Sequence, residues 1–269
     1  MIREPAFAGQ FYPGSKDALI KQFESFLKNR DFKKENKAKG LVLPHAGYIY
    51  SGKVAIETIA NFELGNTIII LGPNHSGLGK DFSLSGADAW DTPFGRIDID
   101  KKITLEILKN SKYIQKDDDA HRLEHSIEVQ LPLLQYVKKD FKIVPIIVLS
   151  SNVKAYEDIG LELASIIKSS SREITIIAST DLTHYEPQDI AQNKDKIAID
   201  AILELNVKKL IENIKKLNIS MCGYAPTSIM IETLKNIGAC KAKLIKYQTS
   251  GDTTGDYTSV VGYAGIGLY

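Results

Sequence analysis

The 269-residue sequence predicts one α/β domain over residues 1–269, in which helices flank a mostly buried mixed sheet. Apolar, largely β-branched runs at 67–71, 142–149 and 173–180 are typical of strands that are covered on both faces. Helical patterns separate several of these runs, as in a parallel sheet built from βαβ units. A hairpin and a closing strand pair are expected as well, and they would make the sheet mixed.

The first third of the chain predicts a strand at 41–44 (LVLP) and a helix from about Lys53 to Asn61, with Ser51 as the N-cap. The shorter alternating segments 81–86 and 95–100 then predict an edge hairpin around the sequence WDTPFG.

Two helices are predicted next. The first extends from Lys101 to Asn110 and is capped by Asp100. The second covers about Arg122 to Lys138 and is interrupted or kinked near Pro132.

The last 120 residues predict a helix at 155–168 and a mostly helical region at 187–237. Breaks are expected near Asn206, at 218–223 and at Pro226. The end of the chain is typical of a strand, a polar glycine-rich loop and a second strand.

Composition excludes several classes of protein. Hydrophobic residues make up 43% and charged residues 25%, and the net charge of +1 argues against binding to bulk nucleic acid. No apolar run approaches the roughly 20 residues that span a bilayer, and the N-terminal segment is not a signal peptide, so we expect no membrane association and a cytoplasmic location. Two cysteines make no disulfide framework.

Three of the five histidines, His45, His75 and His184, follow shortly after buried-type strands. The carboxyl ends of parallel strands form the ligand crevice of open α/β sheets, so a metal or proton-transfer site is expected there. Asp181 precedes His184 by three residues. Asp181 or Thr180 is predicted to cap a helix whose first turn holds His184 as a general acid or base.

The two cysteines are assigned different roles. Cys222 precedes a helix expected to begin near Ala225, and a thiol near a helix N-terminus has a lowered pKa and can act as a nucleophile or metal ligand. Cys240 opens a strand and is expected to be inert core.

Residues 121–125 (HRLEH) match H-x-x-E-H, the inverted zincin pattern of metal-dependent hydrolases. We expect His121 to lie exposed at the start of a helix and to bind no metal. His125 and Glu128 would instead face the crevice together. The loop 250–257 (SGDTTGDY) is either a solvated hairpin loop or a pocket wall offering backbone N–H groups and the carboxylates of Asp252 or Asp256.

Seven segments in order resemble the Memo family, named for a mediator of cell motility and known in prokaryotes as AmmeMemoRadiSam system protein B. They are REPAFAGQFYP, LVLPHAGYIYSG, LGPNHSG, EHSIEVQLPLL, STDLTHYE, MCGYAP and SGDTTGDYTSVVGYAG. The resemblance covers nearly the whole chain. His121 lies outside the family pattern E-H-S-x-E, so the HRLEH match looks accidental.

The resemblance implies a fold similar to the class III extradiol (LigB-type) non-haem iron dioxygenases. It implies metal ligation by His45, His75 and Cys222, the cysteine replacing a carboxylate ligand of those enzymes. His184, with Asp181 near it, would be the acid–base group. Replacing a carboxylate ligand by a thiolate shifts preference toward Zn, Cu(I) or a differently tuned iron, so a dioxygenase-like pocket does not by itself establish dioxygenase activity.

The leading interpretation is therefore a metal-dependent redox enzyme, with Fe(II) as the expected divalent ion and Zn or Cu as alternatives. Catalysis is assigned to His184 and Asp181, and the surrounding pocket to His125, Glu128 and Asp252. The substrate would be a small molecule or modified residue, and a functional link to the other AmmeMemoRadiSam components is expected. The alternative is a non-enzymatic module that recognises a phosphopeptide, another peptide or a small anion in the same pocket, as eukaryotic members are described to do.

Overall fold

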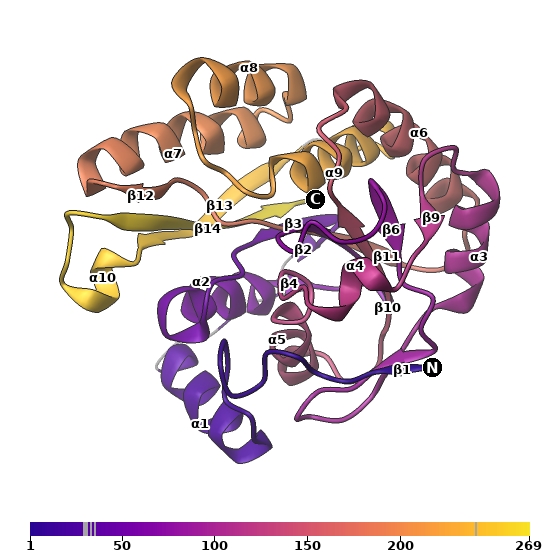
Figure 1. The fold of residues 1–269 in the computed structure, drawn as a ribbon, viewed down its shortest axis with the longest axis horizontal. Coiled ribbons are helices and arrows are strands. Elements are labelled where there is room, and N and C mark those ends of the chain that lie inside the picture. The colour runs from indigo at the N-terminus through magenta and orange to yellow at the C-terminus, as the bar shows by residue number, and fades with distance from the viewer. Residues whose placement is uncertain (29–31, 33, 35, 240) are drawn as a thin grey trace.

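A mixed sheet forms the centre of the protein, in a computed structural model that describes residues 1–28, 32, 34, 36–239 and 241–269. Its strands are β3 (Gly40–Leu43), β5 (Thr67–Pro73), β6 (Phe82–Leu84), β9 (Gln115–Lys116), β10 (Lys142–Val148), β11 (Ile174–Ser179), β12 (His184–Glu186), β13 (Ala242–Thr249) and β14 (Val260–Leu268). Within the described ranges they follow the order β12-β14-β3-β11-β5-β10-β6-β9, with β13 also paired to β14 (Figure 1).

The four central strands β3, β11, β5 and β10 are mutually parallel, whereas β14 and β6 flank them in antiparallel orientation. Each central strand is a nearly continuous apolar run, because both of its faces are covered. In β5, Ile69 and Leu71 pack into one hydrophobic cluster and Ile68 and Ile70 into the other. The predicted buried mixed sheet is confirmed.

Helices cover both faces of the sheet, giving three layers (Figure 1). On one face lie α1 (Lys16–Leu27), α2 (Tyr48–Ala60) and α5 (Gln130–Val137). On the other lie α3 (Lys101–Asn110), α6 (Val153–Ser169), α7 (Gln188–Leu203), α8 (Val207–Leu217) and α9 (Tyr224–Asn236). The single turns α4 (Asp119–Arg122) and α10 (Gly251–Thr254) belong to loops.

The predicted edge hairpin is only half right. Its turn joins β7 (Ala89–Trp90) to β8 (Ile97–Asp98), and β1 (Ile2–Arg3) pairs with β7 to complete a small sheet. The segment 81–86 instead provides β6, which pairs with β10 in the main sheet. A second small sheet pairs β2 (Asn36–Lys37) with β4 (Phe62–Glu63).

Two helix starts differ from the prediction. Helix α2 begins at Tyr48 rather than Lys53, with Gly47 as its N-cap, and Ser51 lies inside it, where its hydroxyl donates to the Ala46 carbonyl. This earlier start places the helix directly after the His45 loop.

The predicted helix over Arg122 to Lys138 is likewise replaced by α4, an irregular turn and α5. Pro132 then falls in the first turn of α5. Backbone N–H groups there have no partner within the helix, so the missing N–H of proline breaks no hydrogen bond and causes no kink.

Other predicted boundaries are confirmed. Asp100 caps α3 by accepting a hydrogen bond from the Ile103 amide, and Asn206 caps α8 in the same way. One expected break is wrong: Pro226 does not interrupt the helix, because it occupies the first turn of α9. The expectation for Cys240 lies outside the described residues. Among the described helices none is both long and apolar enough to cross a membrane.

Helix α2 lies unusually close to strand β14, and glycine makes this possible. A Cβ atom at Gly265 would come within 1.8 Å of the Thr58 hydroxyl and 3.2 Å of the Val54 carbonyl. Such distances cannot be accommodated without moving the helix, which also supports the His45 loop.

We therefore expect Gly265→Ala to lower the free energy of unfolding by about 1–3 kcal/mol through overpacking. Urea denaturation measures the change. Gly14→Ala is the matched control, since its Cβ would meet its nearest neighbour at 3.5 Å, and it should stay within about 0.5 kcal/mol of wild type. Equal stability of Gly265→Ala and Gly14→Ala would contradict the close packing described here.

Candidate metal centre

Three adjacent strands deliver the polar residues of the site. Strand β11 lies between β3 and β5. The carboxyl end of β3 leads to His45, that of β5 to His75, and that of β11 to Asp181. The adjacency follows from the parallel order and fulfils the rule that ligand crevices form at this edge. A third imidazole, His125, comes from the turn between α4 and α5.

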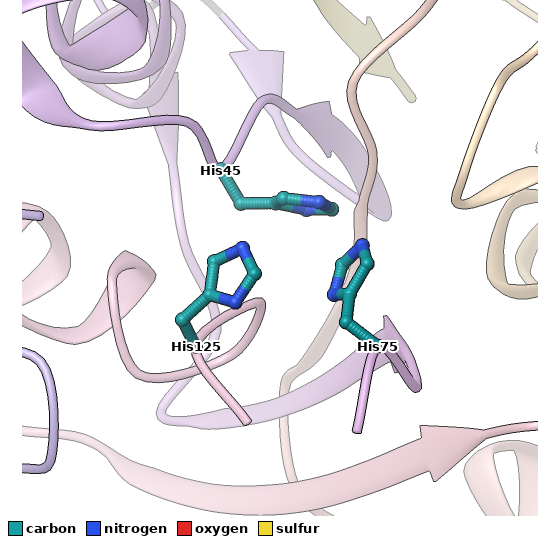
Figure 2. A group of neighbouring side chains, drawn as sticks. All are labelled: His45, His75 and His125. Atoms are coloured by element: carbon teal, nitrogen blue, oxygen red, sulfur yellow. The ribbon is translucent and has the colours of Figure 1, made fainter. Parts of the chain in front are cut away.

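The rings of His45, His75 and His125 face one another (Figure 2). One ring nitrogen from each residue lies within 4.8 Å of those of the other two. The ring centroids are 5.1 Å apart for His45 and His75, 5.4 Å for His45 and His125, and 4.7 Å for His75 and His125. This group can hold a metal ion through imidazole nitrogens.

His45 is fixed on two sides. Its backbone N–H donates to the Asp181 carboxylate at 2.8 Å, and its ring Nδ1 lies 2.9 Å from the Ser179 hydroxyl. The side chain is 2% exposed, and burial lowers the pKa of His45 well below its ordinary value. The ring is therefore neutral at pH 7 and keeps one nitrogen lone pair.

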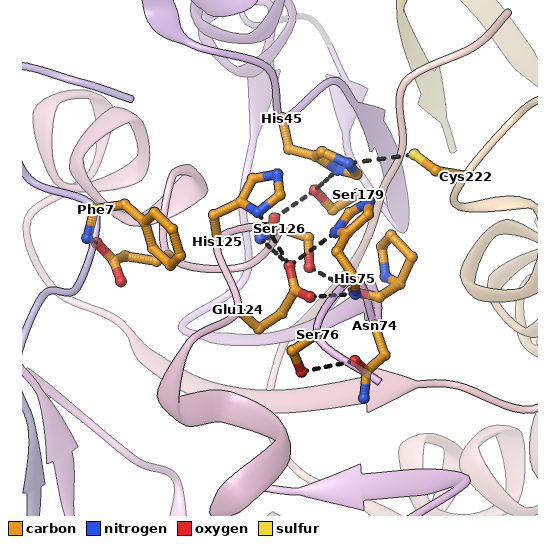
Figure 3. Close-up of polar contacts among 12 residues, drawn as sticks. Phe7, His45, Asn74, His75, Ser76, Glu124, His125, Ser126, Ser179 and Cys222 are labelled. Carbon is orange, nitrogen blue, oxygen red and sulfur yellow. Dashed lines mark hydrogen bonds and ion pairs between the residues drawn. The ribbon is translucent and has the colours of Figure 1, made fainter. Parts of the chain in front are cut away.

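Glu124 orients His75 (Figure 3). Its carboxylate accepts the backbone N–H of His75 and, at 3.0 Å, its ring Nδ1–H. Burial alone would raise the pKa of Glu124, but the hydrogen bond and charge of His75 outweigh it and hold that pKa at about 2. Burial likewise opposes a charge on His75, yet Glu124 raises its pKa. A carboxylate behind a histidine is the usual support of a metal ligand.

Sequence reasoning missed this role of Glu124. The residue was assigned only as the acid of the HRLEH pattern, and its partner lies 49 residues earlier in the chain. The E-H-S-x-E motif was the one available signal, because it includes Glu124 and excludes His121.

His125 was assigned to the surrounding pocket, and the structure brings it into the histidine group itself. Its ring packs against Phe11 at a centroid distance of 4.4 Å and against Phe7 at 5.5 Å. Burial is the largest cause that lowers the pKa of His125 to about 4, so this ring is also neutral at pH 7.

Glu128 supports the pocket from behind rather than lining it. Its fully buried carboxylate pairs with the Arg3 guanidinium at 2.7 Å and accepts the Ala6 and Phe7 amides and the Tyr12 hydroxyl at 2.7–2.9 Å. These bonds hold the N-terminal segment that places Phe7 and Phe11 on His125.

Cys222 lies beside the histidine group. Its Sγ is 3.2 Å from His45 Nε2 and accepts the Asp181 backbone N–H at 3.2 Å. Gly223 permits this approach, since a Cβ there would lie 2.3 Å from the Ser179 carbonyl. Burial, followed by the charge of Asp181, raises the pKa of the Cys222 thiol, so the expected lowering by the α9 N-terminus is wrong. Metal ligation by Cys222 stays a prediction.

Asp181 and His184 line the same cavity as the three histidines. The predicted helix at this point is absent: His184 opens strand β12, and Asp181 caps no helix but holds the His45 backbone. Burial raises the pKa of Asp181. The His184 ring Nδ1 donates to the Ser220 carbonyl at 2.9 Å, and its backbone N–H donates to the Ser220 hydroxyl.

The cavity has a volume of about 770 Å³ and a partly aromatic wall. Its rings are Phe11, Tyr50, Tyr185 and Tyr263. Tyr185 is 78% exposed at a register irregularity of β12, with a left-handed φ of 59°. From the predicted loop wall at 250–257, Ser250, Thr254 and Asp256 line the cavity, and Ser259 just after this loop lines it as well. Asp252 lies outside this lining and accepts the Thr249 amide.

His121 is buried, contrary to the prediction that it is exposed, and lies outside the histidine group. Its Nε2 donates to the Ser83 carbonyl at 3.1 Å, Trp90 packs against its ring, and its Nδ1 has no hydrogen-bond partner among the described residues. Burial, then the charge of Arg3, lowers its pKa from 6.5 to about 4.

Acid should therefore destabilise the protein through His121. Between pH 6.5 and 4 His121 is protonated in the unfolded chain but remains neutral in the folded protein. The stability that the neutral ring contributes is therefore fully present above pH 6.5 and is lost as the pH falls toward 4. We expect a loss of roughly 3 kcal/mol over this range in wild type relative to His121→Gln, which keeps a donor for Ser83. Urea unfolding measured at several pH values tests this. Parallel pH profiles would show that His121 is not held neutral.

The fold and site define an α/β protein whose central parallel strands end at a candidate histidine metal centre. A family model described as Memo-like protein matches residues 3–267. A MEMO1 family protein of Methanocaldococcus jannaschii is 44% identical over 98% of this chain and 97% of its own length. A MEMO1 family protein of Aquifex aeolicus is 43% identical over 98% of both chains. The chain belongs to the Memo-like family.

A solved structure shares the fold. An uncharacterised Escherichia coli K12 protein superposes with a TM-score of 0.59 at 10% sequence identity, covering 86% of this chain and 99% of that one. At this identity the likeness concerns the fold alone.

Proposed function

We propose that this protein is a metal-dependent redox enzyme that acts in its aromatic-walled cavity on a small molecule or a modified residue. The observation that carries the proposal is the meeting of His45, His75 and His125 at one end of the cavity. Perturbed, clustered titratable groups at the carboxyl edge of a parallel sheet favour a functional site over a structural one.

The donor set fits a borderline transition metal. Imidazole nitrogen suits Fe, Zn and Cu, whereas Mg²⁺ and Ca²⁺ prefer oxygen ligands. His45 and His125 are neutral at pH 7, and the Glu124 carboxylate leaves His75 Nε2 as its candidate ligand atom. A redox-active ion such as Fe(II) would supply electron-transfer chemistry here, while Zn would only polarise a substrate.

The third ligand has two candidates beside His45 and His75. His125 contributes a nitrogen within 4.8 Å of the other two. Cys222 is the ligand that the Memo resemblance implies, and its sulfur already lies at 3.2 Å from His45 Nε2. The thiol must lose its proton to bind a metal, and its raised pKa favours His125 until an ion supplies the compensating charge.

His184 is proposed as the general base, assisted by Asp181. The Ser220 carbonyl only accepts hydrogen bonds, so His184 Nδ1 carries the ring proton. Nε2 is then the nitrogen that accepts a proton from a substrate in the cavity. Asp181, whose pKa is raised by burial, lines the same cavity as His184 and is proposed to assist it.

Metal content tests the ligand set. We expect about one transition-metal ion per chain after anaerobic purification, and a loss of at least tenfold in occupancy in His45→Ala and His75→Ala. Elemental analysis measures this, with the remote His121→Gln as control. His125→Ala and Cys222→Ser compared directly identify the third ligand, since the true ligand shows the same loss. Wild type without bound metal, also after reconstitution with Fe(II), Zn or Cu(I), would refute the metal proposal.

His184→Ala separates proton transfer from metal binding. We expect its metal content to stay within twofold of wild type, while any metal-dependent oxygen consumption falls by about 10²–10⁴-fold, the usual contribution of a general base. Elemental analysis and an oxygen electrode give the two readings. Metal loss equal to that of His45→Ala would make His184 a ligand instead.

A non-enzymatic binding role is the second candidate, and the cavity mouth favours it. The exposed Tyr185 ring and the hydroxyls of Ser250, Thr254 and Ser259 suit contacts to a peptide or small anion. Tight peptide binding by metal-stripped protein, without turnover of any kind in the metal-loaded form, would support this role. The cytoplasmic location is proposed from the composition of the sequence, and a functional link to other AmmeMemoRadiSam components from the family resemblance.

A further inference from the structure

We propose that Ser179, held in place by Gln130, fixes His45 as the tautomer that carries its proton on Nδ1 and offers Nε2 to the metal. The two residues are positioning residues, and neither lines the cavity. The inference rests on the proposed metal site for its purpose, but the tautomer itself is a property of the metal-free protein.

The Ser179 hydroxyl has one proton, and its destination is fixed. Its Oγ lies 2.6 Å from the Ser126 backbone carbonyl, which can only accept a hydrogen bond. Ser179 must therefore donate to Ser126 (Figure 3). Toward its remaining neighbours the oxygen can act only as an acceptor, through its two lone pairs.

Gln130 takes one of these lone pairs. Its Nε2 donates to Ser179 Oγ at 2.8 Å and to the Pro44 backbone carbonyl at 2.9 Å. The opposite orientation of the amide would set its oxygen against the Pro44 carbonyl oxygen, so it is the amide nitrogen that faces Pro44 and Ser179. The cost is a buried Gln130 Oε1 without a hydrogen-bond partner among the described residues.

The second lone pair of Ser179 faces His45 Nδ1 at 2.9 Å. An unprotonated Nδ1 would set two lone pairs against each other in a fully buried place, which is strongly unfavourable. Nδ1 must therefore carry the proton, and His45 Nε2 presents its lone pair. The Cys222 Sγ lies 3.2 Å from this nitrogen.

The arrangement gives the thiol a defined part in the metal-free protein. Sγ accepts the Asp181 amide, and the thiol proton has two acceptors within reach, the Asp181 carbonyl at 3.6 Å and His45 Nε2 at 3.2 Å. A metal that binds Nε2 must break this contact. The same Gln130 side chain also anchors the Pro44 carbonyl, so ring and backbone of His45 are set together.

The tautomer can be observed directly by long-range ¹H–¹⁵N NMR of the metal-free, reduced protein labelled with ¹⁵N-histidine. In wild type we expect His45 Nδ1 to show the signal of a protonated nitrogen and Nε2 that of an unprotonated one. In Ser179→Ala the acceptor is gone, and the ring should populate the Nε2–H form. Ser228→Ala removes another fully buried hydroxyl, outside the cavity, and should leave the His45 signals unchanged.

A second reading tests the purpose of the arrangement. Zn²⁺ titration of the same proteins should show a 10–100-fold weaker affinity for Ser179→Ala than for Ser228→Ala, the usual effect of removing a partner behind a metal ligand. Wild-type His45 protonated on Nε2, or an unchanged tautomer in folded Ser179→Ala, would overturn the inference. Absence of binding of Zn²⁺, Fe(II) and Cu(I) to wild type would instead refute the proposed metal site and leave the NMR result standing.

Discussion

The site depends on one constraint, the parallel alignment of β3, β11 and β5 in the middle of a sheet that is covered on both faces. Inside the sheet most side chains are apolar, and the few polar ones, such as Thr175 and Ser179, are hydrogen-bonded, so the ionisable groups collect where the strands end. Because the three strands are neighbours, those ends meet at one edge. His45, Asp181 and His75 are brought together by backbone pairing before any interaction among them contributes.

Much of this arrangement could be predicted from the sequence. Continuous apolar runs identified the central strands, and the Pro44–His45 and Asn74–His75 positions after them predicted where the imidazoles would gather. Local signals of this kind are informative because a strand that is buried on both faces must consist almost entirely of apolar residues. The cap at Asp100 was predictable for the same reason, since it depends on a few neighbouring residues.

The remainder depended on contacts between residues far apart in the chain. The turn between α4 and α5 has no periodic pattern, so the sequence could not place His125 in the histidine group or Glu124 behind His75. His121 looked exposed after an acidic run, yet Trp90 and Ser83 enclose it. The prediction that the pKa of the Cys222 thiol is lowered was wrong for a similar reason. Desolvation of the thiol outweighs the effect of the nearby helix N-terminus, and desolvation depends on the whole fold.

The buried Glu128 carboxylate has a consequence for the order in which the molecule is assembled. Its partners in the N-terminal segment precede it by 116 to 125 residues, so the ribosome makes them long before the group that fixes them. Contacts of such high sequence separation form late and slow folding. Nascent chains shorter than about half the protein consequently lack Glu128, and with it the group that holds Phe7 and Phe11 against His125.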